Sequence, residues 1–155
     1  MADITFQALI SAANFAQLKR HRLATLIAGD YLPEFGNTLP ESVIAAGLGN
    51  EFKEIIDQTN STYFKIKEKH GPAADYILTN SHRRLILMKM NLREIYHFVR
   101  LRDDEHAQWD IRRLAHQLAE KVKIIMPLSA MMLCGKSDFD QKYKKNFQPL
   151  PGEDI

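Results

Sequence analysis

The short supply of β-strands is the feature that most restricts how this chain can fold. Only two segments, 3–10 and 83–90, predict a strand. In the first, Ile4, Phe6 and Ile10 fall on one face of a period-2 pattern. The second has four successive apolar residues, which suits a strand covered on both faces, although a buried helix is also compatible. Two strands are marginal unless helices cover them, so further strands are expected from a partner copy or from absent sequence.

The remaining periodic segments predict helices, and the order of elements predicts an α+β fold that is mostly helical with a small sheet. Ser11 and Asn91 stand where side-chain N-caps are preferred. Asp103 and Asp104 are expected to open the last helix, and residues 29–41 read as a loop from their Gly, Pro and Asn content. The expected helices cover 11–28, 50–69, 72–79, 92–102 and 105–126.

Size and composition predict one domain, 3–135, followed by a polar tail, 136–155. The chain has 155 residues, 45% of them hydrophobic, which suits a single globular domain. Neither a signal peptide nor an apolar run long enough for a membrane span is found. The single Cys134 excludes an internal disulfide and favours a cytoplasmic setting. Because a strand begins at residue 3 without a lead-in, the chain is expected to be a piece of something longer.

Charge argues against a nucleic-acid partner. Lys and Arg number 21 and Asp and Glu 19, a net charge of +2. Two clusters, 19–22 and 83–84, are locally basic. The first is either a solvated helix face, with long stems over apolar neighbours, or a phosphate-recognition site that uses the arginine fork. RNA binding through both clusters is a weaker third possibility, against which the near-neutral net charge argues. We therefore expect neither a nucleic-acid nor a membrane partner.

Helix 92–102 carries a stripe with polar ends. Asn91, Ile95, Phe98 and Arg102 fall at i, i+4, i+7 and i+11, on one helical face. This stripe is either a flat ligand platform or a core stripe with polar ends, and the spacing by itself favours the core.

Other candidate residues lie close by. Arg93 and His97 form a second i, i+4 pair, and Trp109 lies opposite the apolar stripe of helix 105–126, as expected for burial on two fronts. His106, expected near the start of that helix, would have its cationic form disfavoured by the helix dipole. No spacing of His and Cys predicts a metal site, and neither a serine nucleophile motif nor a Gly-rich phosphate loop is found.

Two blocks of the sequence resemble the flavin-dependent thymidylate synthases. The longer, residues 91–111, reads Asn-Leu-Arg-Glu-Ile-Tyr-His-Phe-Val-Arg-Leu-Arg-Asp-Asp-Glu-His-Ala-Gln-Trp-Asp-Ile. It is similar to a family pattern of Asn-x-Arg, Leu-Arg and His-Ala-Gln-Trp-Glu-Ile. The shorter, residues 17–25, reads Gln-Leu-Lys-Arg-His-Arg-Leu-Ala-Thr and resembles the start of the family signature Arg-His-Arg-x-x-Ser. The resemblance covers about residues 4–127.

This resemblance implies a homo-oligomer with shared active sites that reductively methylates dUMP to dTMP, using FAD, NADPH and methylenetetrahydrofolate. It implies that Arg102 is the catalytic residue that polarises the uracil ring at its N3/O2 edge, where a cation stabilises developing charge. The implied FAD-binding residues are Arg20, His21, Arg22, Asn91, Arg93 and His97. The implied substrate-binding residues are Gln17, Arg20, Arg102 and His106.

Several positions depart from the family pattern. Asp30 stands where the family has a phosphate-binding Arg, Asp75 where a second such Arg is expected, and His97 where an Asn contacts FAD. The Glu and Ser that follow Arg-His-Arg are absent, as is the family's N-terminal stretch. Each lost charge-assisted phosphate contact costs ~1.5–3 kcal/mol. The expected protein is therefore a partial or degenerate thymidylate synthase domain, with catalysis left open; the alternative is a non-catalytic structural or oligomerisation module of a larger or tandem enzyme.

Overall fold

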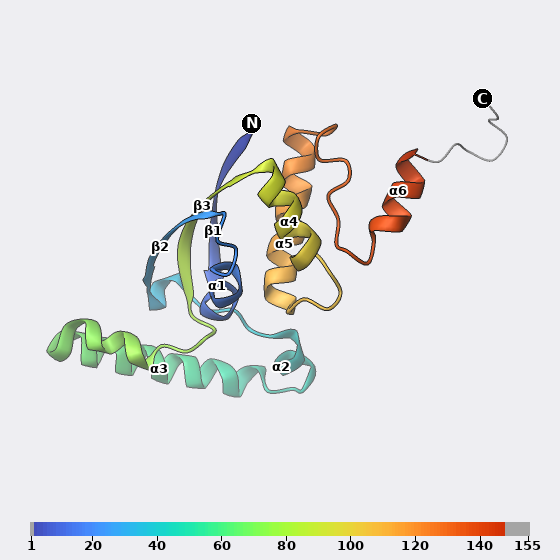
Figure 1. The fold of residues 1–155 in the computed structure, drawn as a ribbon. Helices are drawn as coiled ribbons and strands as arrows, with labels where there is room; N and C mark the ends of the chain where they lie inside the picture. The colour runs from blue at the N-terminus through green and yellow to red at the C-terminus, as the bar shows by residue number, and fades with distance from the viewer. Residues whose placement is uncertain (1, 148–155) are drawn as a thin grey trace, which may run out of the picture. The chain divides into compact units, whose positions relative to one another are not determined.

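The computed structural model describes residues 2–147, and within them the α+β class is confirmed (Figure 1). The strands are β1 (Asp3–Ser11), β2 (Thr25–Tyr31) and β3 (Arg83–Asn91). The α-helices are α1 (Ala12–Leu18), α2 (Glu41–Ala45), α3 (Gly49–His70), α4 (Leu92–Arg102), α5 (Trp109–Ile125) and α6 (Phe139–Phe147). Two 3-10 helices, η1 (Pro33–Phe35) and η2 (Gly71–Ile77), complete the set.

The chain divides into two compact units, each described here by itself. The α4–α5 unit takes in the chain up to Ile4, the short piece His21–Ala24 and the chain from Lys89 onward. The α1–α3 unit takes in Thr5–Arg20 and Thr25–Met88. None of the helices between residues 2 and 147 has the length and apolar character needed to span a membrane.

The sheet has three antiparallel strands in the order β1-β3-β2 (Figure 1). In β1, exposed residues alternate with covered ones, as the period-2 pattern predicted. The predicted strand at 83–90 is confirmed as β3, whose Ile86 and Met88 are buried. The prediction that both faces of this strand are covered is wrong for the part of the chain that the structure describes, because Leu87 is 43% exposed.

Strand β2 corrects both the helix expected over 11–28 and the count of two strands. Ser11 does cap a helix, its side chain accepting a hydrogen bond from the Asn14 N–H, but this helix ends at Leu18. The residues from Thr25 to Tyr31 include β-branched and aromatic side chains that favour a strand. Pairing with β3 therefore outweighs a helical spacing that local sequence alone supports.

The arginines at 83 and 84 are engaged inside the α1–α3 unit. Arg83 Nε donates to Thr38 Oγ1 at 2.9 Å. Arg84 Nε donates to the Gly29 carbonyl at 2.8 Å, and its guanidinium lies 4.2 Å from the centre of the Tyr31 ring. These contacts join β3 to β2 and to the chain that follows it, so this basic cluster is structural.

A buried histidine holds the loop before β3 to α3. His82 is 0% exposed. Its Nδ1 accepts from the Thr79 N–H at 3.0 Å, which leaves Nε2 to donate to Asn60 Oδ1 at 2.9 Å. Burial lowers the pKa of His82, so the ring is neutral at neutral pH. The His82 carbonyl accepts from the Ala12 N–H at the start of α1, so one residue ties three segments together.

In the α4–α5 unit, the last long helix starts four residues later than expected. Gln108 is its N-cap, with Oε1 accepting from the N–H groups of Asp110 and Ile111. Asp104, expected to open the helix, instead accepts from the N–H groups of His106 and Ser137. Helices α4 and α5 lie side by side (Figure 1). They bury Ile95, Phe98, Val99, Ile111, Ala115, Leu118, Ala119 and Val122.

Part of the expected polar tail is helical. Helix α6 places Phe139, Tyr143 and Phe147 on one face, with ring centroids 6.3 Å and 5.1 Å apart along the row. Residues 148–155 of that tail lie outside the described residues. The domain boundary at 135 stays a prediction.

Gly135 is expected to be irreplaceable within the α4–α5 unit. It is buried, and a Cβ added to it would lie 1.9 Å from the Asp103 carbonyl oxygen, which is backbone and cannot move aside alone. Gly135→Ala should therefore lower the free energy of unfolding by about 1–3 kcal/mol or more. Urea unfolding followed by circular dichroism measures this. Gly49→Ala is the matched control, since nothing lies within 4 Å of its added Cβ; equal stability of both variants would contradict the close approach.

Candidate functional site

The Lys19–Arg22 cluster lies in the turn between α1 and β2, not in the middle of a helix as expected. Lys19, Arg20 and Arg22 are exposed, which agrees with either of the readings left open for them. His21 differs from its neighbours, because it is only 5% exposed. The turn thus places one imidazole in the interior of the α4–α5 unit.

Two polar side chains of this unit meet at His21. Arg102, the last residue of α4, donates from Nε to His21 Nε2 at 3.0 Å. On the other side of the ring, His21 Nδ1 lies 3.3 Å from Glu94 Oε1. The side chains of His21 and Glu94 are 3% and 2% exposed. The result is a row of a buried carboxylate, a buried imidazole and a half-buried guanidinium, here called the Glu94–His21–Arg102 row.

The imidazole in this row is neutral at neutral pH. Burial, the Arg102 cation and His97 together lower the pKa of His21 from 6.5 to about 4. The contact between His21 and Glu94 is therefore not an ion pair at pH 7. Because Nε2 accepts a hydrogen bond from Arg102, the single ring proton belongs on Nδ1, the atom that faces Glu94.

The stripe of α4 that ends at Arg102 is a core stripe with polar ends. Ile95 and Phe98 are each 0% exposed, which confirms the interpretation that the spacing favoured. Asn91 caps the helix, with Oδ1 accepting from the Glu94 N–H at 2.9 Å. The Phe98 ring packs edge-on against His21 at 4.9 Å between centroids. The apolar stripe thus supports the polar row, and no flat ligand platform is formed.

The second pair on α4 faces solvent. Arg93 and His97 are exposed, and the His97 ring lies 5.8 Å from that of His21. The α4–α5 unit contains most of the site residues that the resemblance implies: His21, Arg22, Asn91, Arg93, His97 and Arg102. Gln17 and Arg20 belong to the α1–α3 unit, where Gln17 is half-buried and Arg20 exposed.

His106 corrects one expectation. It lies before α5, with a side chain 86% exposed and its Nε2 3.5 Å from Glu105 Oε1. Since α5 begins at Trp109, the expected effect of the helix dipole on His106 does not arise. Among residues 2–147, no group of three His, Cys, Asp or Glu side chains gathers closely enough to hold a metal ion.

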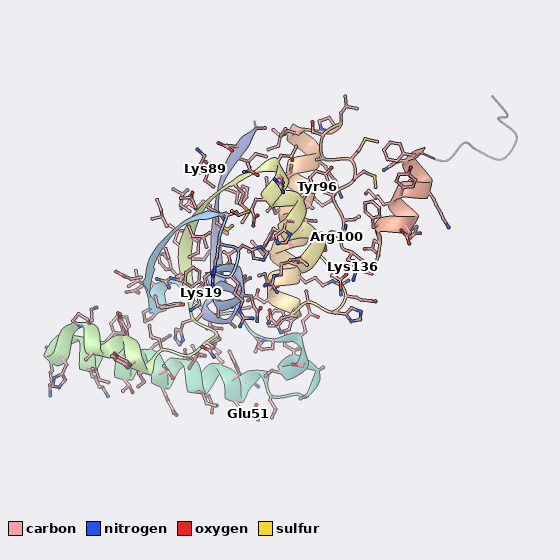
Figure 2. All side chains as sticks on the ribbon, in the orientation of Figure 1. Lys19, Glu51, Lys89, Tyr96, Arg100 and Lys136 are labelled. Carbon is pink, nitrogen blue, oxygen red and sulfur yellow. The ribbon has the colours of Figure 1, made fainter. Side chains whose placement is uncertain are left out.

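A small pocket adjoins the outer face of α4. It has a volume of about 160 Å³ and is lined by Tyr96, His97, Arg100, Met132, Cys134 and Phe139. Figure 2 labels Tyr96 and Arg100 on α4, and the Lys136 N–H donates to the Arg100 carbonyl at 3.1 Å. Pockets for cofactor-sized ligands are usually about 300–1,000 Å³. Burial also raises the pKa of the Cys134 thiol, so it is a poor nucleophile.

Sequence reasoning missed Glu94. In the sequence it is one acidic residue in the first turn of the helix expected over 92–102, where a carboxylate suits the helix dipole. The signal that could have found it is periodicity, because Glu94 stands one turn before Phe98 on the buried side of α4. Its partner His21 lies in the turn between α1 and β2, which the helix expected over 11–28 does not predict.

Comparison with known proteins agrees with the two blocks of the sequence. Residues 1–128 match the family described as thymidylate synthase complementing protein. The flavin-dependent thymidylate synthase of Sulfurisphaera tokodaii is 32% identical over 127 residues, covering 76% of this chain and 49% of that protein. The enzyme of Geobacter sulfurreducens is 33% identical over 130 residues, with 76% and 55% covered. The flavin-dependent thymidylate synthase of Thermococcus kodakarensis is 36% identical over 117 residues, covering 68% of this chain and 48% of that protein.

The chain therefore belongs to the thymidylate synthase complementing protein family. It spans about half the length of the curated relatives that it matches. These relatives are named as flavin-dependent thymidylate synthases.

Stability should depend on pH through His21. Since folding lowers the pKa of His21 from 6.5 to about 4, the unfolded chain binds more protons between these values. The free energy of unfolding should fall as pH drops from 6.5 towards 4, by up to about 3 kcal/mol from this residue. Urea unfolding at pH 4.5, 5.5 and 7 measures it.

His21→Gln should flatten this pH dependence, leaving the smaller part that buried His82 adds in the same direction. His70→Gln, which replaces an exposed histidine at the end of α3, should keep the full slope. An unchanged slope in His21→Gln would show that the ring is not held neutral by folding.

Proposed function

We propose that this chain takes part in flavin-dependent formation of dTMP from dUMP, as a partial form of the enzyme with an altered nucleotide phosphate site. The observation that carries the proposal is Arg102, which His21 holds at the end of α4 within the block of residues similar to the family pattern. A half-buried, oriented guanidinium suits the carbonyl edge of a uracil ring, where it would stabilise charge developing during methyl transfer.

The residues of the α4–α5 unit suit FAD. Its diphosphate needs cationic donors, and Arg22 and Arg93 are exposed on this unit. Its ring system needs hydrogen-bonding groups, which Asn91 and the exposed His97 can supply. Bound FAD would supply the redox chemistry of the methylation, with NADPH as reductant and methylenetetrahydrofolate as carbon donor. Arg20 of the α1–α3 unit is proposed as a further contact for FAD and, with Gln17, for the nucleotide.

The roles of His21 and His106 are less direct in this proposal. His21 is taken from the resemblance as a flavin-facing residue, but its burial and its two polar neighbours favour supporting Arg102. His106 is proposed to reach the nucleotide from the exposed loop before α5.

The phosphate of the nucleotide is where this chain departs from a complete site. Asp30 on β2 and Asp75 in η2 are both exposed carboxylates in the α1–α3 unit. A carboxylate repels phosphate, where the family pattern has arginine. We propose that this chain depends on another polypeptide, a partner copy or a second part of the same enzyme, to complete the nucleotide site.

A non-catalytic oligomerisation module is the second candidate function. The end of α5 and the turn after it expose large apolar side chains, with Ile124 at 82%, Ile125 at 64% and Leu128 at 83%. Exposed apolar groups of this kind are common at interfaces between subunits. Trp109, at the other end of α5, is 38% exposed.

Flavin binding tests the first proposal without requiring turnover. Purified protein mixed with FAD should retain the flavin on equilibrium dialysis. Arg93→Ala should weaken binding by about tenfold or more, because it removes a charge-assisted contact. Arg112→Ala is the matched control, since it removes an exposed arginine of α5 that no role is proposed for.

Catalysis is tested separately. Expression of the chain alone and with a full-length relative in a thymidylate-requiring host distinguishes an independent enzyme, a partner-dependent one and a structural module. Absence of FAD retention, alone or with the partner, together with no growth, would overturn the enzymatic proposal in favour of the module.

A further inference from the structure

The two ring nitrogens of His21 have different neighbours, and this difference determines which of them carries the proton. Nε2 faces a group that can only donate, the Arg102 Nε–H, at 3.0 Å. Nδ1 faces a carboxylate oxygen, Glu94 Oε1, at 3.3 Å. We propose that Glu94 is a positioning residue, which holds His21 as its Nδ1–H tautomer and thereby fixes the orientation of the Arg102 guanidinium.

The other neutral tautomer of His21 would make both of its polar contacts unfavourable. With the proton on Nε2, two N–H groups would oppose each other at the Arg102 contact, and a bare Nδ1 would face the Glu94 oxygen. Both contacts would be repulsive in a buried site, where polar groups without partners are costly. The Nδ1–H tautomer makes both contacts attractive, and Glu94 is the group that favours a proton on that side.

Glu94 is held in place from its own helix. Its backbone N–H donates to the Asn91 cap at 2.9 Å, and its side chain is 2% exposed on the first turn of α4. Arg102 ends the same helix. One helix therefore carries both outer members of the row and His21 joins them from a separate turn, so a shift of the His21 ring would move the guanidinium plane.

The titratable and charged groups that face His21 are few. Glu94 and Arg102 lie on its two nitrogens, and His97 lies 5.8 Å away between ring centroids. Phe98 covers one side of the ring at 4.9 Å. Nε2 accepts a hydrogen bond from Arg102, whereas Nδ1 lies 3.3 Å from Glu94 Oε1 without hydrogen-bond geometry, so the contact with Glu94 is electrostatic. The His21 ring is buried and serves as a positioning group for Arg102.

The role of Arg102 towards uracil rests on the proposed function, but the tautomer and the guanidinium contact do not. Both can be measured on the protein without any ligand. Nitrogen NMR of ¹⁵N-labelled protein at pH 7 reports the protonation of each His21 nitrogen, and the exchange of the Arg102 Nε–H with water reports its hydrogen bond. The His21 signals are assigned by their loss in His21→Gln.

We expect the wild-type His21 to show a protonated Nδ1 and a bare Nε2. The Arg102 Nε–H should exchange about tenfold more slowly than that of the exposed Arg112, as one charge-assisted hydrogen bond implies. Glu94→Leu should produce an Nε2–H fraction and bring Arg102 exchange close to that of Arg112. Glu94→Gln keeps an acceptor oxygen and should largely retain both signals.

Two further variants separate positioning from general stability. Glu54→Gln removes an exposed carboxylate of α3 and should change neither signal. His21→Gln should keep the slow Arg102 exchange, because the amide oxygen can accept from Arg102 while the amide nitrogen donates to Glu94. A wild-type Nε2–H tautomer, or wild-type signals in folded Glu94→Leu, would overturn the proposal. If Glu94→Leu does not fold, fast Arg102 exchange in His21→Gln would overturn it instead.

Discussion

Polar groups removed from water need partners, and this requirement shapes the interior of the α4–α5 unit. A carboxylate, an imidazole and a guanidinium meet there, and the side chains of Glu94 and His21 are almost fully buried. Burial disfavours a charged ring and the Arg102 cation beside it would repel a protonated imidazole, so the pKa of His21 falls to about 4 and the ring stays neutral. A neutral ring can accept on one side and donate on the other, which a charged one cannot. The apolar stripe of α4, with Ile95 and Phe98, supports this row.

The α1–α3 unit also contains a buried neutral histidine, His82, whose ring proton is on the opposite nitrogen from that of His21. His82 accepts on Nδ1 and donates from Nε2, and burial again lowers its pKa. There the ring joins a loop to a helix, and its backbone carbonyl meets the start of α1. In each unit one buried histidine links segments that are distant in sequence. The two rings differ in what they hold, because Asn60 is neutral whereas Arg102 is a cation suited to an anionic or carbonyl ligand.

Membership of the thymidylate synthase complementing protein family gives these features a chemical context. The chain spans about half the length of its curated relatives. Asp30 and Asp75, both exposed, stand at positions where the family pattern leads us to expect arginine. In the proposed function, Arg22, Arg93 and the Glu94–His21–Arg102 row of the α4–α5 unit would serve flavin and uracil. The basic pair that begins β3 is instead engaged in contacts with β2 and with the chain that follows it, since Arg84 binds the Gly29 carbonyl and Arg83 binds Thr38. The two basic clusters of the sequence, 19–22 and 83–84, thus differ in role: the second makes structural contacts, whereas the first is proposed to bind ligand.

The sequence by itself determined the elements whose signals are local. The alternation in β1, the caps at Ser11 and Asn91, and the course of α3 and α4 all depend on residues within about four positions of one another. The tertiary structure decided the rest. Strand β2 replaces a helix because β3 supplies its hydrogen-bonding partner, and α5 starts late because Asp104 binds Ser137, 33 residues away. The contact between His21 and Arg102 joins residues 81 positions apart, a separation that no spacing rule covers. Local propensity fixes where a helix can begin, whereas the state of a buried polar group is set by whichever distant group folding places beside it.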